Sequence, residues 1–361
     1  MSRTVLVTGA TGYIAKYIVL KLLDRGDTVI GTVRREGADA EMRAALEPAL
    51  RDPSALTRYK SVTLDLLSDH GWSDAMIGVD AVIHTASPFP MTPPKDAEEL
   101  IAPAVDGTLR VLRAAHQAGV LDVVVTSSIA AIMAPSERVD VYSETVWTDP
   151  DKAGLPAYIR SKTLAERAAW DFIEKEAPEL RLSAINPGFV IGAPLDGSYG
   201  TSVSLIERLL KGKDPMIPNY GLATCHVEDA AEAHLRVLAV PEAIGHRHII
   251  CDRFLWLKDI ADAVRKVAPG ARVPSRIAPD FAVRFMGLFD ASIRSISKDL
   301  GRSYEMDTTR MREVLGRSPR DAIDGVTETA EWLVSRVAGS APPPKRVQQA
   351  LPRRRQVSVA Q

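Results

Sequence analysis

The stretch Thr-Val-Leu-Val-Thr-Gly-Ala-Thr-Gly-Tyr-Ile-Ala-Lys, residues 4–16, decides the fold. Aliphatic residues at 5–7 lead into Gly9, Gly12 follows, and apolar residues then recur at helical spacing, which predicts a strand, a tight turn and a helix. Glycines let the backbone approach a pyrophosphate closely, and the N-terminus of the helix favours its negative charge. Ala15 stands where many dinucleotide-binding folds have a third glycine. The stretch predicts a dinucleotide site, although such turns also occur for purely structural reasons.

The composition is that of an ordinary globular protein. The chain has 361 residues, of which 46% are hydrophobic and 25% charged, and its net charge is −1. This balance indicates no attraction to nucleic acid or to an acidic membrane, and no apolar run approaches the roughly 20 residues of a membrane helix. The two cysteines, Cys225 and Cys251, fit neither a disulfide framework nor a metal site. We therefore expect a cytoplasmic protein without a metal, a nucleic-acid partner, a membrane partner or a signal peptide.

Strand-like and helix-like segments alternate after the glycine turn, which is typical of a parallel sheet covered by helices on both faces. The six expected strands make a doubly wound, Rossmann-type α/β sheet. After the first strand at 5–7, strands are expected at 28–33, 62–64, 81–84, 123–126 and 182–185. Helices are expected at 97–118, 157–175, 203–210, 228–238, 257–267 and 324–337.

The pattern divides the chain into three regions. Residues 1–190 are expected to form the dinucleotide-binding domain, and residues 191–335 a smaller C-terminal substrate-binding part, with an exchange of elements between the two left open. Residues 336–361 hold several prolines, five basic residues and no acidic one after Gly339, so we expect a disordered basic tail. Nothing in the sequence fixes the oligomeric state as monomer or homodimer.

The end of the second expected strand indicates which dinucleotide binds. Folds that prefer NAD have an acidic residue there, about 20 residues past the glycines, to bind the ribose hydroxyls. Here the strand ends in Arg34 and Arg35, and guanidinium groups suit a 2′-phosphate because a planar fork of donors meets its oxygens. This favours NADP(H) over NAD(H), with Glu36 as the counter-argument. Asp65 follows the third strand, where a carboxylate can accept the adenine amino group or cap a turn.

Tyr158 and Lys162 give the strongest indication of chemistry. Positions four apart share one helix face, so phenol and ammonium project into one space, and a nearby cation is expected to lower the pKa of the phenol toward the range of an acid-base catalyst. The spacing alone is common by chance. Ser127 and Ser128, however, follow a strand whose carboxyl end is where ligands bind in such sheets. Serine, tyrosine and lysine together suit carbonyl reduction.

These features resemble the extended short-chain dehydrogenase/reductase superfamily. Three strings are more specific and are similar to its dihydroflavonol reductase, cinnamoyl-CoA reductase and aldehyde or ketone reductase branch: Val-Ile-His-Thr-Ala-Ser-Pro-Phe at 82–89, Tyr-Ile-Arg-Ser-Lys-Thr-Leu-Ala-Glu-Arg-Ala-Ala-Trp at 158–170 and Asn-Pro-Gly-Phe-Val-Ile-Gly at 186–192. The similarity spans about residues 4 to 335.

The resemblance implies a role for each matching residue. Tyr158 would donate the proton to a substrate carbonyl oxygen, Lys162 would hold the nicotinamide ribose and lower the pKa of Tyr158, and Ser128 would hydrogen-bond the carbonyl as charge develops. The pyrophosphate would be surrounded by Gly9, Thr11, Gly12, Tyr13 and Ile14. Arg34 would bind the 2′-phosphate, and Asp65 and Leu66 would contact the adenine. The cofactor would also be lined by Thr85, Ala86 and Ser87. The residues against the nicotinamide would be Pro187, Gly188 and Val190.

Several functions remain open at this stage. The leading hypothesis is an NADPH-dependent reductase of an aldehyde or ketone. Met133 stands five residues after Ser128, where plant dihydroflavonol reductases have an Asn, and a thioether donates no hydrogen bond, which favours an apolar or aromatic carbonyl substrate. The alternatives are a sugar-nucleotide epimerase, a hydroxysteroid dehydrogenase on the same scaffold and a non-catalytic NADP-binding regulatory protein. Ile129 and Ala130 follow Ser128 where dehydratases have Asp-Glu, which disfavours dehydration.

Overall fold

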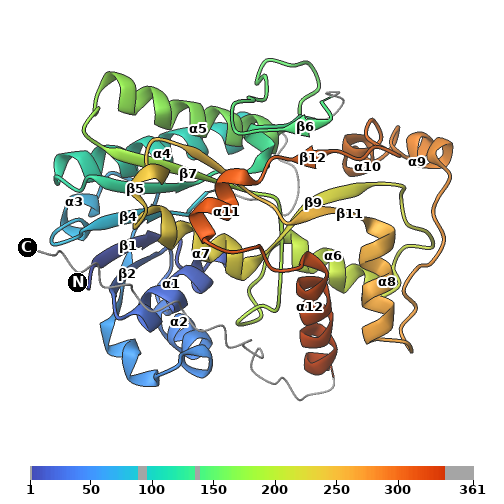
Figure 1. The fold of residues 1–361 in the computed structure, drawn as a ribbon, viewed down its shortest axis with the longest axis horizontal. Coiled ribbons are helices and arrows are strands. Elements are labelled where there is room, and N and C mark those ends of the chain that lie inside the picture. Colours follow the sequence, from blue (N-terminus) through green and yellow to red (C-terminus); the bar gives the residue numbers. More distant parts are fainter. Residues whose placement is uncertain (1, 88–95, 135–138, 338–361) are drawn as a thin grey trace, which may run out of the picture.

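The computed structural model describes residues 2–87, 96–134 and 139–337 (Figure 1). Its centre is a seven-stranded sheet in the order β10-β7-β5-β4-β1-β2-β3, and every neighbouring pair is parallel. The strands are β1 (Thr4–Thr8), β2 (Thr28–Val33), β3 (Tyr59–Thr63), β4 (Ala81–His84), β5 (Asp122–Thr126), β7 (Arg181–Pro187) and β10 (Arg247–Ile250).

Helices cover both faces of this sheet because successive strand side chains point to opposite sides. In β1, Val5 and Val7 join one apolar core and Leu6 joins the other. The first core is completed by α1 (Tyr13–Arg25), α2 (Ala38–Leu46), α7 (Val227–Val237) and α11 (Thr309–Leu315). The second is completed by α3 (Trp72–Ala75), α4 (Glu98–Gln117) and α5 (Ala157–Lys175), and Figure 1 shows α4 and α5 along the upper side of the sheet.

The doubly wound parallel sheet predicted from the sequence is confirmed, with differences at its edges. The sheet has a seventh strand, β10, which comes from the region beyond residue 190 and pairs with β7. The third strand begins at Tyr59 rather than at residue 62, because the mixed segment Tyr-Lys-Ser-Val-Thr carries too few apolar residues to mark its start. Helix α5 begins and ends as predicted, and α4 and α7 differ by one residue at each end.

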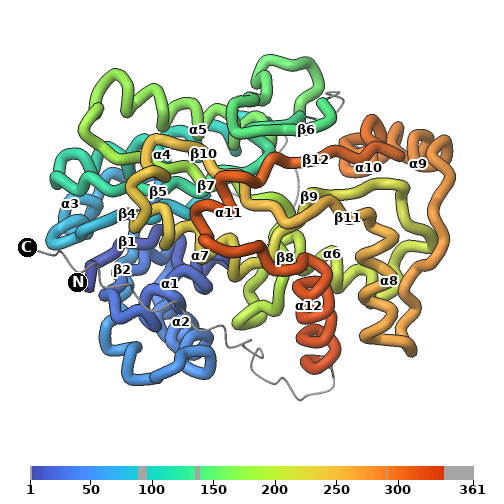
Figure 2. Tube along the Cα trace, viewed as in Figure 1, coloured from blue at the N-terminus to red at the C-terminus, as the bar shows by residue number. Residues whose placement is uncertain are grey.

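The rest of the C-terminal half forms a smaller layer beside the sheet, on the right in Figure 2. A three-stranded sheet of β11 (Arg253–Trp256), β9 (Gly221–His226) and β8 (Phe189–Ile191) packs against three helices: α6 (Thr201–Leu210), α8 (Leu257–Val267) and α12 (Ala322–Val337). Two further helices, α9 (Asp280–Met286) and α10 (Ala291–Ile296), lie beyond a two-stranded pairing of β6 (Val141–Tyr142) with β12 (Glu305–Met306). The predicted basic tail lies outside the described residues from 338 onward, and residues 336 and 337 end α12.

Candidate active site

The sheet order reverses between β1 and β4, and in open parallel sheets ligands bind at the carboxyl ends of strands at such a point. Gly9 follows β1 with a φ of +62°, a conformation that favours glycine. A Cβ at this position would lie 2.9 Å from the Cα of Ala86, which follows β4. The two turns therefore touch, and half-buried Thr85, Ala86 and Ser87 lie directly beside the glycine turn. Pro88 and Phe89 lie outside the described residues.

The N-terminus of α1 is suited to bind phosphate. Gly12 is its N-cap, and a Cβ there would lie 3.2 Å from the Gly9 carbonyl oxygen, so a side chain would crowd the turn. Within the described residues, neither an acidic side chain nor a side-chain cap lies at this end of the helix, which leaves its N–H groups to a ligand. Thr11 lies in this turn, and Tyr13 and Ile14 begin α1, so their contact with a pyrophosphate stays a prediction.

Three side chains of α1 hold the loop that follows β8, which sequence reasoning missed. The hydroxyl of Tyr13 donates to the carbonyl oxygen of Gly192 at 2.6 Å, and that of Tyr17 donates to Ala193 at 2.6 Å. Lys16 is 3% exposed and its ammonium lies 2.5 Å from the Asp196 carboxylate. The side chains of Tyr13, Lys16 and Tyr17 therefore hold the loop at 192–198 against α1. Because Asp196 is 180 residues away in sequence, no local pattern indicates this pair.

Arg34 and Arg35 are both exposed beyond β2, but their surroundings differ. The guanidinium of Arg35 pairs with the carboxylate of Glu41, and this hydrogen bond raises the pKa of Arg35. Arg34 makes no ion pair with any carboxylate that the structure describes. Its guanidinium is therefore available to an anion at the end of β2.

Asp65 and Leu66 lie at the end of β3. Asp65 is exposed, and its Oδ1 accepts the N–H of Leu67 at 2.9 Å, so one oxygen closes a turn and the other is left for a ligand. Leu66 is half-buried, and its side chain packs against Gly107 of α4. The turn role that the sequence left open for Asp65 is therefore observed, and the contact of Asp65 and Leu66 with adenine stays a prediction.

Ser128, Tyr158 and Lys162 come together at the carboxyl edge of the sheet. Ser128 follows β5, and its Oγ accepts the N–H of Ala130 at 3.1 Å. Tyr158 stands in the first turn of α5, and its side chain is hydrogen-bonded to that of Ser128. Lys162 lies one turn further along α5 and is 9% exposed. The structure thus places the serine and tyrosine hydroxyls in contact, with the lysine on the same helix.

The pKa shifts at this site differ from the sequence-based expectation. Burial raises the pKa of the Tyr158 phenol, and the hydrogen bond from Ser128 opposes that rise. Burial lowers the pKa of Lys162 to about 8, while the Glu166 carboxylate counteracts the change. The sequence predicts that Lys162 lowers the pKa of Tyr158. In the structure that pKa is raised instead, because desolvation of the phenol outweighs the hydrogen bond from Ser128. A phenol with a raised pKa stays protonated at neutral pH, as a proton donor must.

A buried carboxylate, Glu166, organises the region beneath these side chains. It lies one turn after Lys162 and its side chain is 1% exposed. Its oxygens accept hydrogen bonds from the Ser127 hydroxyl at 2.5 Å, from the Asn186 amide at 2.7 Å and from the Arg247 guanidinium at 2.6 Å. The Asn186 amide also donates to the backbone oxygen of Ser128 at 3.2 Å. Glu166 thereby ties Ser127, which follows β5, to Asn186 of β7 and Arg247 of β10 beside Ser128.

The end of β7 supplies the remaining predicted cofactor residues. Pro187 ends β7, and the N–H of Gly188 donates to the Ile250 oxygen at 3.0 Å. A Cβ at Gly188 would lie 2.4 Å from the Ala223 oxygen, so only glycine lets the chain pass this close to β9 before β8 pairs with it. Val190, in β8, is 8% exposed and joins the main core. After Ser128, Ala130 and Ile132 are buried, and Ile129 and Met133 are half-buried against a separate small core that contains Ile132.

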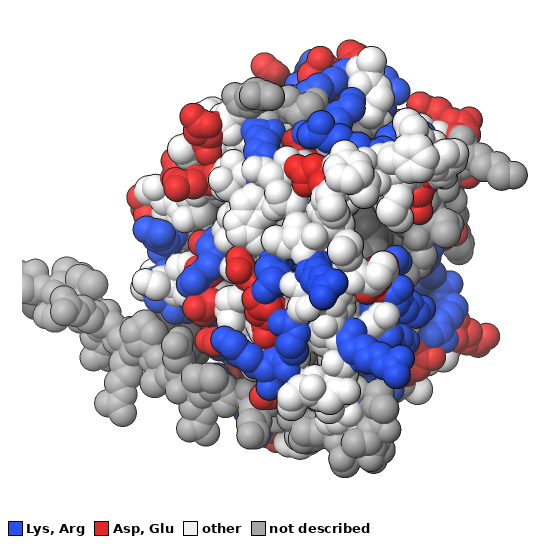
Figure 3. Space-filling model, turned by 90° about the vertical axis from the view of Figure 1, so that its right-hand side faces the viewer, with Lys and Arg blue, Asp and Glu red and all other residues white. Residues whose placement is uncertain are grey.

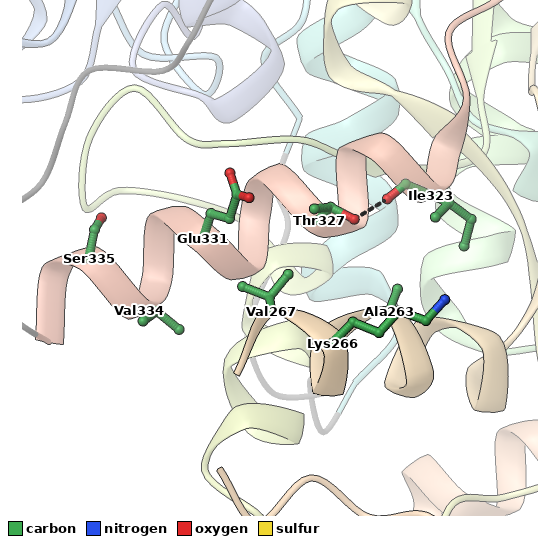
Figure 4. Close-up of a pocket in the computed structure, with 8 residues that line it drawn as sticks. All are labelled: Ala263, Lys266, Val267, Ile323, Thr327, Glu331, Val334 and Ser335. Carbon is green, nitrogen blue, oxygen red and sulfur yellow. Dashed lines mark hydrogen bonds between the residues drawn. The ribbon is translucent and has the colours of Figure 1, made fainter. Parts of the chain in front are cut away.

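The described structure also has a cavity and a charged surface, and the cavity does not include the residues of the predicted site. A cavity of about 690 Å³ lies between α8 and α12, lined by residues such as Lys266, Thr327 and Glu331 (Figure 4). None of its lining residues belongs to the predicted site. Charges of both signs are intermixed over the face shown in Figure 3. Within the described ranges, no cluster of three or more His, Cys, Asp or Glu side chains could hold a metal ion, and no helix there has the length and apolarity to cross a membrane.

Comparisons with known proteins place the chain in a family. Residues 5–251 match the model of the NAD dependent epimerase/dehydratase family. Cinnamoyl-CoA reductase CAD2 from Medicago truncatula is 34% identical over 84% of this chain and 92% of its own length, and a putative NADPH-dependent methylglyoxal reductase, GRP2, from Candida albicans is 33% identical over 74% and 84%. The crystal structure of yeast methylglyoxal/isovaleraldehyde reductase Gre2 complexed with NADPH covers 93% of this chain and 99% of its own, with a TM-score of 0.76 and 26% identity. The chain therefore belongs to the NAD-dependent epimerase/dehydratase family, the extended short-chain dehydrogenase/reductases.

Proposed function

We propose that this chain is an NADPH-dependent oxidoreductase that reduces an aldehyde or ketone to an alcohol, with Tyr158 as the proton donor. The observation that carries the proposal is the hydrogen bond between the Ser128 and Tyr158 side chains, one helical turn from Lys162, at the carboxyl edge of a sheet whose glycine turn opens onto α1. The similar proteins are reductases, which favours reduction over epimerisation.

The residues of this chain fit NADP(H). Gly9 and Gly12 leave a turn in which a side chain would collide with backbone, the helix end behind them carries no acidic residue, and Arg34 is available for a 2′-phosphate. When bound, NADPH supplies a hydride to the carbonyl carbon. Tyr158 gives its phenolic proton to the carbonyl oxygen, and Ser128 hydrogen-bonds that oxygen as it gains charge. Lys162, positively charged at neutral pH, holds the ribose hydroxyls.

The substrate that this site favours is an apolar or aromatic carbonyl compound. Ile129 and Met133 present apolar groups after Ser128, and neither donates a hydrogen bond to a substrate hydroxyl. An NADPH-oxidation screen over aromatic aldehydes, ketoesters, dicarbonyls, flavonoids and steroids tests this assignment. Turnover confined to flavonoids with free hydroxyls would contradict it.

The NADPH preference predicts an asymmetric effect of Arg34→Ala. Because a charge-assisted hydrogen bond contributes about 1.5–3 kcal/mol, the KM for NADPH should rise by about tenfold to 100-fold, while the KM for NADH stays within about twofold. Steady-state kinetics with both nucleotides measures this. Arg35→Ala is the matched control, with a smaller effect because Arg35 is already paired with Glu41. Equal changes in both KM values for Arg34→Ala would remove Arg34 from the 2′-phosphate site.

A further inference from the structure

The imidazole of His84 lies between the glycine turn and the catalytic lysine. His84 is the last residue of β4 and is 3% exposed. Its Nδ1 lies 2.8 Å from the Thr8 hydroxyl at the end of β1, and its Nε2 lies 3.4 Å from the Thr108 hydroxyl in α4. The proposed reaction assigns no role to this buried, titratable group, so its hydrogen bonds need a separate account.

The Thr8 hydroxyl fixes the direction of the first hydrogen bond. A hydroxyl has one proton to donate and two lone pairs to accept with. The N–H groups of Thr85 and Ala86 both donate to the Thr8 Oγ1, at 3.1 and 3.0 Å. With both lone pairs occupied, the Thr8 proton is left for the Nδ1 of His84. The Nδ1 atom is therefore an acceptor and carries no proton.

The contact of the second ring nitrogen, Nε2, supports the same protonation state of His84. The Thr108 hydroxyl donates its own proton to the carbonyl oxygen of Ala104 at 2.8 Å. Toward His84 it can act only as an acceptor, which requires a proton on Nε2. Both ends of the ring thus select the same neutral tautomer, with the proton on Nε2 and a lone pair on Nδ1.

We infer that His84, as the neutral Nε2–H tautomer, is a positioning residue for the cofactor site. By taking the Thr8 proton, it leaves both Thr8 lone pairs to the N–H groups of Thr85 and Ala86. These two bonds hold the β4 turn against Gly9, where Ala86 lies in van der Waals contact. The inference rests on the proposed function, because its consequence is a preformed surface for NADPH.

The charged form of His84 would not fit this arrangement. A proton on Nδ1 would need a lone pair of Thr8, and one backbone N–H would then lose its acceptor. The Lys162 ammonium nearby and burial both disfavour a second positive charge, and together they lower the pKa of His84 to about 3, with burial the larger cause. The imidazole therefore stays neutral at neutral pH, and its two hydroxyl partners select the tautomer.

Nitrogen-15 NMR of the full chain tests the tautomer without any cofactor. The expected spectrum assigns to His84 a non-protonated Nδ1 and a protonated Nε2, with no change between about pH 5 and pH 8, in contrast to an ordinary His with a pKa near 6.5. A protonated Nδ1, or titration within this window, would overturn the inference. The signal is assigned by its loss in His84→Asn.

Two substitutions test the positioning role, because Asn and Gln replace different ring nitrogens. The oxygen of Asn lies the same number of bonds from Cβ as Nδ1, and that of Gln the same number as Nε2. His84→Asn keeps an acceptor for the Thr8 proton and should bind NADPH within about threefold of the natural protein, while His84→Gln should weaken binding by about tenfold. Thr8→Ser and Thr8→Val form a second pair, and only the valine should weaken binding.

The outcomes separate this inference from the proposed function. If the natural protein binds no NADPH by fluorescence titration, the proposed function fails, and the NMR result still decides the tautomer. If the natural protein binds NADPH but His84→Gln binds it as tightly as His84→Asn does, the positioning role fails. Thermal unfolding of each variant confirms that a folded chain is compared, and the comparison of Thr8→Val with Thr8→Ser serves if a His84 variant does not fold.

Discussion

Replacement of Tyr158 by phenylalanine is expected to lower kcat for carbonyl reduction by about 10² to 10⁴, the range contributed by a positioned general acid. The change removes the hydroxyl that is hydrogen-bonded to Ser128 and keeps the ring, so the packing at the start of α5 is retained. The dissociation constant for NADPH should change little, because the lost proton matters only when the carbonyl oxygen gains charge. Stopped-flow kinetics and a fluorescence titration measure the two quantities.

Tyr199→Phe is the matched control for this experiment. Tyr199 packs edge to face on Trp332 at 5.8 Å and lines a cavity of about 780 Å³ between α6, α8 and α12. Loss of its hydroxyl should leave kcat within about twofold, as expected for a surface change away from the reacting groups. Undiminished turnover in Tyr158→Phe would remove Tyr158 from its role as proton donor.

Replacement of Arg247 by methionine is expected to destabilise the fold by about 3–5 kcal/mol, because it leaves the buried Glu166 carboxylate without its cation. The Arg247 side chain is 7% exposed, its guanidinium lies 3.6 Å above the Trp147 ring, and it donates to backbone oxygens of Glu144 and Val146. Urea unfolding measures the change in the free energy of unfolding. Activity should fall with stability, since Glu166 also holds Ser127 and Asn186 beneath the site.

Two further variants allow the effect of Arg247→Met to be interpreted. Arg253→Ala removes an arginine that pairs with Asp252 and Asp321 while its side chain is 49% exposed, so it should cost less than about 1 kcal/mol. Adding Glu166→Gln to Arg247→Met should recover part of the lost stability, because the double variant buries no uncompensated charge. If Arg247→Met is no more destabilising than Arg253→Ala, the buried pair has no structural role.

The sequence predicted the parts of this molecule that local patterns encode. The glycine turn before α1 was predictable because its backbone requires a glycine at Gly9, where φ is positive. The limits of α5 were predictable from the helical periodicity around Tyr158 and Lys162. The parallel order of the sheet follows from alternating strands and helices. The turn and the helix depend on residues that are close together in sequence.

The features that the sequence did not predict depend on contacts between distant residues. Glu166 has the sequence pattern of a solvated helix residue, and its burial is made tolerable by Arg247, 81 residues away, together with Ser127 and Asn186. Lys16 is buried through Asp196 in the same way. The strand β10 begins with the polar residues Arg247 and His248, so its pattern does not mark it as a buried strand of the main sheet. The raised pKa of Tyr158 also needed the structure, because desolvation depends on what surrounds the phenol.

Transfer of a labelled hydride tests the central claim most directly. The enzyme is incubated with NADPH deuterated at the reactive carbon of the nicotinamide and with each carbonyl compound of the screen, and the alcohol products are analysed by mass spectrometry and NMR. We predict an alcohol that carries deuterium on the former carbonyl carbon, formed much more slowly by Tyr158→Phe. NADPH binding without any deuterated alcohol across the whole panel, or an alcohol without the label, would contradict the account.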